Sequence, residues 1–65
     1  MMDEHEHDLA KLLAGANLVL ERYLGTPGNS ATDTCYLRLS EVRDSIDREL
    51  THYRFRVLAG QLRLA

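Results

Sequence analysis

The side chains best suited to chemistry in this sequence are three histidines, one cysteine and a few carboxylates. His5 and His7 are two positions apart, so on a helix their side chains diverge by about 200° and do not share a metal ion. They would be able to share one only if this segment were not helical. The ligand spacings of common metal sites are missing. We therefore expect neither a metal nor another cofactor.

Cys35 is the single cysteine, which excludes an internal disulfide. It lies on an apolar stripe of the second helix predicted below, where a buried cysteine acts as a small hydrophobic residue. No histidine is close to it in sequence. We therefore expect a core residue and not a thiolate nucleophile.

Ser40 and Asp44 lie one helical turn apart in the segment LSEVRDSID, residues 39–47. This pair resembles the Ser-x-x-x-Asp motif of the small hairpin phosphatases that act on aspartyl-phosphate in sporulation relays. The resemblance covers a few residues, and Arg43 stands where that family has Leu before the Asp. We interpret both side chains as solvated residues of a helix face and expect no catalytic residue.

The length and composition of the chain predict one small folded domain. It has 65 residues, 45% of them apolar, and one proline. A core of this size is marginal alone. The start, MMDEHEHD, is acidic and polar, unlike a secretory signal. No apolar run approaches the ~20 residues of a membrane span. We therefore expect a cytoplasmic protein that does not bind membranes.

Charge is unevenly distributed along the chain. The net charge of −2 gives no general attraction to nucleic acid. Acidic residues gather at the start and basic residues at the end: Asp3, Glu4, Glu6 and Asp8 against Arg54, Arg56 and Arg63. Seven of the eight basic residues are Arg, which fits a GC-rich coding genome of bacterial or phage type.

The first predicted helix covers about residues 4–24. Its apolar residues fall within one stripe about 140° wide, as an amphipathic helix requires. The acidic start suits the positive end of the helix dipole, and Gly25 stands where a C-terminal glycine cap belongs. The stripe consists of Leu9, Leu12, Leu13, Ala16, Val19, Leu20, Tyr23 and Leu24.

A loop over residues 25–33 leads to a second helix over about residues 31–64. The loop contains Gly, Pro, Asn and Ser, which are typical of turns. Ser30 is a candidate N-cap with Asp33 in the capping-box position, and Thr32 or Asp33 are the alternatives. The main stripe of this helix spans about 80°, close to a coiled-coil seam. It consists of Cys35, Leu39, Val42, Ile46, Leu50, Tyr53, Val57 and Leu64.

Two amphipathic helices with a short loop predict an all-α antiparallel hairpin that forms a single domain over residues 1–65. Counting back from the loop places Asp3 beside residue 54, so the rest of the longer second helix overhangs. We expect Leu13 and Ile46 in the core. Because C2 dimers are the commonest oligomers, we expect a homodimeric four-helix bundle, or completion by a partner chain.

The overhanging segment is apolar on two faces, which is typical of a buried or interface helix. Phe55, Leu58 and Leu62 form a second stripe nearly opposite the first. The expected protein interface consists of Tyr53, Phe55, Arg56, Val57, Leu58, Leu62, Arg63 and Leu64.

These features favour a small non-catalytic regulator, inhibitor or adaptor that binds protein. In outline the hairpin is similar to small co-chaperones of type III secretion needles and to phage-encoded inhibitors. The alternative class is nucleic-acid binding, as in the hairpin dimers that clamp paired RNA loops in plasmid copy-number control. Glu41 and Glu49 lie beside the basic side of the second helix, so nucleic acid is the less favoured partner. RNA binding would weaken steeply with salt, unlike an apolar interface.

Overall fold

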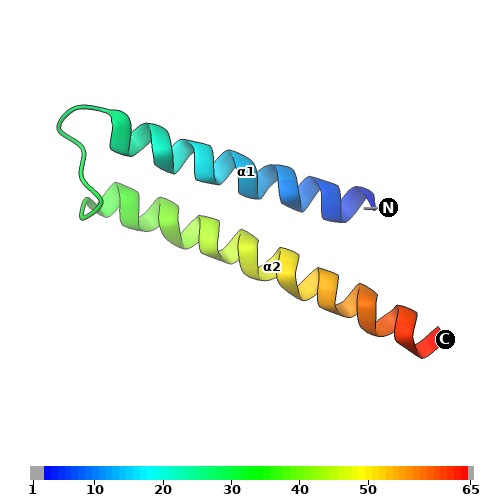
Figure 1. Cartoon of the computed structure of the whole chain (residues 1–65). Coiled ribbons are helices and arrows are strands. Elements are labelled where there is room, and N and C mark those ends of the chain that lie inside the picture. The colour runs from blue at the N-terminus through cyan, green and yellow to red at the C-terminus, as the bar shows by residue number, and fades with distance from the viewer. Residues whose placement is uncertain (1–2, 65) are drawn as a thin grey trace.

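The computed structural model describes the backbone of residues 3–64 and the side chains of residues 3–61. Helices α1 (Glu4–Gly25) and α2 (Thr34–Leu64) run antiparallel and pack against each other (Figure 1). No strand occurs within residues 3–64. The predicted all-α hairpin is therefore confirmed, with extents of 54 × 18 × 11 Å.

The two helices differ in length, as predicted. Helix α1 has 22 residues and α2 has 31. The hydroxyl of Tyr53 donates a hydrogen bond of 2.6 Å to the carboxylate of Asp3, and the ring of His5 lies 4.6 Å from that of Tyr53. The register thus agrees with the predicted one to within a residue. Beyond this point α2 continues past the start of α1 (Figure 1), and residues 55–64 are called the overhang below.

Helix α1 begins and ends through local hydrogen bonds. Asp3 is the N-cap, and its carboxylate accepts a 2.8 Å hydrogen bond from the backbone N–H of Glu6. The expected glycine cap at Gly25 is wrong, because Gly25 is the last helical residue and Thr26 closes the helix in an extended conformation. The left-handed position that favours glycine comes later in the loop, at Gly28, where φ is 88°.

Helix α2 begins three residues later than expected, at Thr34. The carboxylate of Asp33 accepts a 3.0 Å hydrogen bond from the backbone N–H of Ser30, and the N–H of Asp33 donates to the carbonyl of Ser30. These bonds form a separate turn before the helix. The backbone carbonyl of Asp33 then accepts a 3.0 Å hydrogen bond from the backbone N–H of Leu37. The predicted Ser30–Asp33 pairing therefore exists, but outside the helix.

The core of the hairpin is narrow. Leu20 and Leu50 are buried, at 4% and 3% exposure, and every other described side chain is half-buried or exposed. Leu13 and Ile46, which we expected in the core, are half-buried. The expected burial of Cys35 is wrong.

Cys35 is exposed because its neighbour faces the other helix instead. The ring of Tyr36 lies 6.0 Å from the ring of Tyr23 on α1. Cys35 therefore sits at the margin of the contact between the helices, on a side that neither helix covers.

Shortening Leu50 or Leu20 to Ala should destabilise the hairpin most. Each change leaves a cavity at the centre of the contact between the helices, and we expect Leu50→Ala to lower the free energy of unfolding by about 2–5 kcal/mol. Urea denaturation followed by circular dichroism measures this. Leu18→Ala is the matched control, because Leu18 is exposed on α1. Equal losses for Leu50→Ala and Leu18→Ala would contradict the assignment of the core.

Candidate protein-binding surfaces

One long edge of the hairpin is closed by polar contacts between the helices. The guanidinium of Arg54 forms a 2.9 Å salt bridge with Glu6, and that of Arg43 donates a 3.4 Å hydrogen bond to the side-chain oxygen of Asn17. Arg43 and Arg54 are 54 − 43 = 11 residues apart, about three helical turns, so they lie on the same side of α2. We call this side the latched edge.

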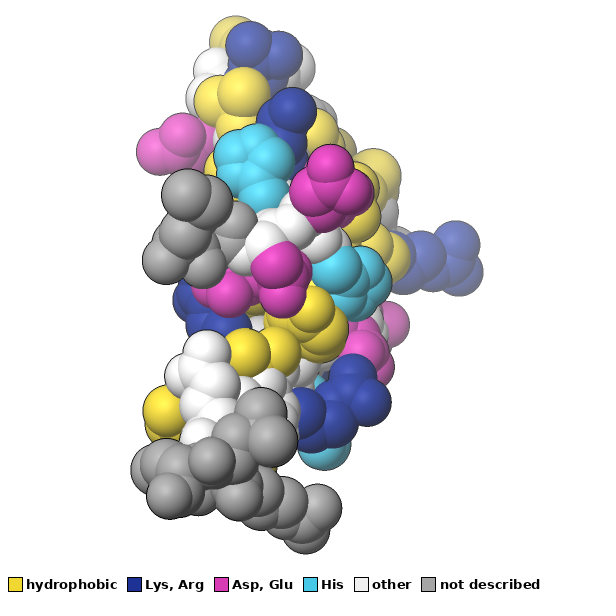
Figure 2. All heavy atoms as spheres, turned by 90° about the vertical axis from the view of Figure 1, so that its right-hand side faces the viewer, with side chains coloured by type: hydrophobic (Ala, Val, Ile, Leu, Met, Phe, Trp, Pro, Cys, Tyr) yellow, Lys and Arg dark blue, Asp and Glu magenta, His cyan; other side chains and the backbone are white. Residues whose placement is uncertain are grey.

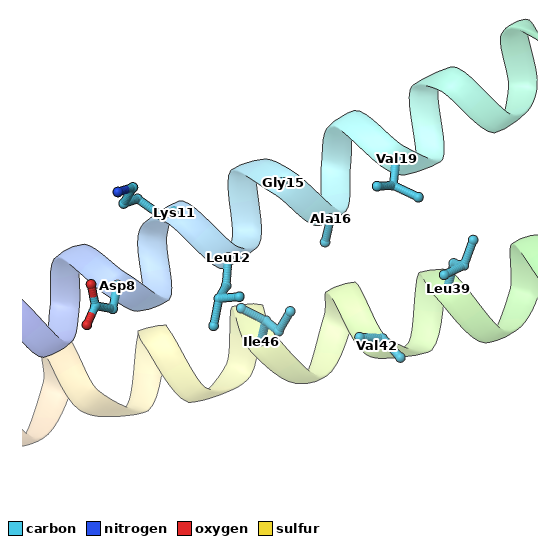
Figure 3. Close-up of a pocket in the computed structure, with 9 residues that line it drawn as sticks. All are labelled: Asp8, Lys11, Leu12, Gly15, Ala16, Val19, Leu39, Val42 and Ile46. Carbon is cyan, nitrogen blue, oxygen red and sulfur yellow. The ribbon is translucent and has the colours of Figure 1, made fainter.

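The other long edge is apolar and open. Side chains from both helices line a shallow groove there with a volume of about 680 Å³ (Figure 3). Asp8 and Lys11 lie at one end of the groove, and Lys11 points away from α2 (Figure 3). We call this surface the open face, and its apolar residues are Leu12, Ala16, Val19, Leu39, Val42 and Ile46.

The open face was missed in the sequence, where all of its residues were assigned to the stripes between the helices. Leu12, Val19 and Val42 are instead exposed, with Val42 at 54%. The signal was present in the width of the first stripe. A stripe of about 140° is wider than a single neighbouring helix covers, so part of it has to face outward.

The predicted interface at the end of α2 divides between two environments. Tyr53 and Val57 are half-buried, and Tyr53 is held by Asp3. Phe55 is 70% exposed, and Leu58 and Arg56 are exposed as well. The side chains of the other three predicted residues, Leu62, Arg63 and Leu64, lie outside the described residues.

Phe55 borders a shallow hollow on the outer side of α2. The other lining residues are mostly polar: Asp47, Arg48, Thr51 and His52. Figure 2 looks onto the end of the hairpin where the two termini lie. It shows acidic and histidine side chains gathered in the middle of that end, with Lys and Arg side chains around them.

Ser40 and Asp44, the pair that resembles a phosphatase motif, make structural contacts. Arg43 donates to the hydroxyl of Ser40 at 3.2 Å and to the carboxylate of Asp44 at 2.8 Å. The residue that departs from the phosphatase motif therefore binds both members of the pair. Among the side chains of residues 3–61, no three His, Cys, Asp or Glu groups come together as a metal site would need.

Each end of the hairpin is fastened by a hydrogen bond from a tyrosine to an aspartate. At the loop, the hydroxyl of Tyr23 donates a 2.8 Å hydrogen bond to the carboxylate of Asp33, which raises the pKa of Tyr23 to about 12. The pKa of Asp33 is lowered by the backbone N–H of Ser30 and by Tyr23. At the other end, the bond between Tyr53 and Asp3 lowers the pKa of Asp3 and raises that of Tyr53. These bonds stabilise neutral tyrosine beside ionised aspartate.

The bond between Tyr23 and Asp33 should make stability fall at both ends of the pH scale. Its contribution is complete between the ordinary pKa values of the two groups, 3.8 and 10.0. It is lost as the pH falls below 3.8, where Asp33 takes up a proton, and as it rises from 10.0 to about 12. Thermal melting across this range should therefore show the largest difference between wild type and Tyr23→Phe at neutral pH.

The control for this measurement is Tyr36→Phe, which alters a neighbouring ring without touching the bond to Asp33. A melting-temperature difference between wild type and Tyr23→Phe that stays constant from pH 3 to pH 12 would show that the bond does not form in solution.

Comparison of the chain with models of protein families, with curated proteins and with solved structures gave no match. Within residues 3–64, neither helix combines the length and the apolar character needed to cross a bilayer.

Proposed function

We propose that this chain is a small non-catalytic protein-binding protein, a regulator, inhibitor or adaptor, that acts through apolar faces of α2. The observation that carries the proposal is the number of large apolar side chains left in contact with water on so short a chain. On α2 these are Leu37, Val42, Phe55 and Leu58. Apolar surface of this extent is typical of an interaction site.

The proposal includes completion of the hairpin as a four-helix bundle by a second copy. Among the side chains of residues 3–61 only Leu20 and Leu50 are buried, so the hairpin has little core of its own, and two-layer packing of helices is the usual solution. The arginine bias favours a protein of bacterial or phage type.

The overhang is the surface that we propose for a partner protein. Phe55 and Leu58 are exposed on a part of α2 that extends past the start of α1 within the described residues, so they can enter a groove as anchors. No Asp or Glu follows Glu49, whereas Arg56 is exposed next to Phe55. The fitting partner therefore has an apolar groove with carboxylates at its rim, which arginine binds in a forked geometry.

Replacing Phe55 should weaken partner binding selectively. A partner is first identified by affinity capture from an extract of the native host and mass spectrometry, then purified. We expect Phe55→Ala to raise its Kd by more than about 10-fold, because buried aromatic anchors dominate such interfaces. Leu37→Ala is the matched control, since Leu37 is also exposed on α2 but lies 55 − 37 = 18 residues before Phe55.

The salt dependence of the same interaction separates the two classes of partner. Binding that falls steeply with salt and requires RNA would replace our proposal with the nucleic-acid alternative. Equal Kd values for Phe55→Ala and wild type would show that the overhang is not the binding surface.

A separate experiment tests the proposal that the chain is non-catalytic. The double variant Ser40→Ala/Asp44→Ala removes the pair that resembles a phosphatase motif, and we expect it to keep both the partner Kd and the biological effect of the wild type. Loss of the effect with folding and binding intact would reveal a chemical step.

A further inference from the structure

We propose that a second copy of this chain covers the open face, and that the two hairpins lie with their loops at the same end. This inference rests on the proposed function, in which a second copy completes the bundle. It adds which face is covered and how the copies are oriented.

The exposed area of the hairpin matches the need for a second copy. The chain of 7.4 kDa exposes 5304 Å². A globular monomer of that mass exposes about 4,200 Å². The excess of about 1,100 Å² is similar to the roughly 800 Å² that each partner buries in a standard protein interface. An occupant as large as another hairpin is therefore needed, and a second copy supplies one.

The two edges of the hairpin differ in a way that selects the open face. The latched edge is bridged by polar contacts, Glu6 with Arg54 and Asn17 with Arg43, and the hollow beside Asn17 and Arg43 is smaller than the groove of the open face, at about 380 Å³. The open face offers apolar side chains from both helices, so a copy turned by 180° places the same apolar surface against it (Figure 3). A surface that meets itself in this way is what a C2 interface requires.

The overhang favours one relative orientation of the two copies. With the loops at opposite ends, the overhang of each chain would extend past the loop of the other and stay uncovered. With the loops at the same end, the two overhangs project from one end of the bundle and face each other across its axis. Gly60 follows Val42 by 60 − 42 = 18 residues, about five turns, so the open face continues onto the overhang. Neighbouring helices are then all antiparallel, as in up-down bundles.

Phe55 stays outside this interface. It follows Val42 by 55 − 42 = 13 residues, which turns it about 140° away from the open face. A dimer with its loops together therefore presents two copies of Phe55 on opposite outer sides of the same end. Such a dimer can hold two partner groups at once, and its avidity exceeds the affinity of one overhang.

The face is tested by charge insertion at two equally exposed positions of α2. Val42 lies on the open face at 54% exposure, and Leu37, at 51%, lies outside the groove. Sedimentation equilibrium at micromolar concentrations should show a wild-type dimer. Val42→Glu should weaken it by more than about 100-fold, because a charge would enter an apolar interface. Leu37→Glu should leave it unchanged. A wild-type monomer, or equal effects of the two variants, overturns the proposal.

The orientation is tested by crosslinking at two glycines in a Cys35→Ser background, with oxidation for Gly15→Cys and a long flexible bis-maleimide for Gly60→Cys. A side chain added at Gly15 or at Gly60 meets no atom within 4 Å, so neither Gly15→Cys nor Gly60→Cys disturbs the hairpin. With the loops together, the linker joins two Gly60→Cys chains at the same end of the dimer. Gly15→Cys forms no disulfide, because the two copies of α1 then lie diagonally, further apart than the about 7 Å that a disulfide spans. With the loops apart, the middle of the open face lies on the symmetry axis and Gly15→Cys crosslinks instead. Crosslinking of Gly15→Cys, or of neither variant, overturns the orientation.

These outcomes are independent of partner binding through the overhang. A monomeric chain whose Phe55→Ala variant still loses its partner would overturn the dimer alone. A dimer with loops together, in which Phe55→Ala binds the partner as wild type does, would overturn the partner surface alone.

Discussion

Two helices that pack against each other can shield only the side chains along their line of contact, and the rest of this structure depends on that limit. Leu20 and Leu50 lie on the line and are nearly inaccessible to water, whereas the residues one position to either side of each are exposed. Apolar burial this narrow holds the helices together only weakly. The aspartate–tyrosine hydrogen bonds at both ends therefore help to fix the register of the hairpin.

The pattern of apolar residues in the sequence was sufficient to predict the architecture. It was not sufficient to predict the rotation of each helix about its own axis. The stripes, the turn residues and a count back from the loop predicted two unequal helices and placed Asp3 within a residue of its partner on α2. Which part of each stripe faces inward depends on particular contacts, such as that between Glu6 and Arg54. No periodicity encodes such a contact, so the open face was assigned to the core and Cys35 was expected to be buried.

We propose a different role for each face of α2. One side meets α1, and the adjoining open face carries the apolar residues that we assign to a second copy. The outer side bears Phe55 and Leu58, which we assign to a partner protein. Ser40 and Asp44, which first suggested a phosphatase motif, are both bonded to Arg43, which also donates to Asn17 on α1. Arg43 thereby joins Ser40 and Asp44 to the latched edge. The faces that we assign to binding lie on other sides of α2.

The overhang has a further consequence for the kinetics of binding. An isolated helix of about ten residues is marginal in water, because nucleation is costly and few turns share that cost. The overhang avoids the cost of nucleation, because it extends a helix already formed between Thr34 and Tyr53. Its own turns are still few. Its helical order and its occupancy are therefore linked, so that fraying competes with any partner that needs the helical form. The low helix propensity of Gly60 then shortens the residence time of the proposed partner on the overhang. Gly60 has this effect although it lies away from the outer anchors Phe55 and Leu58.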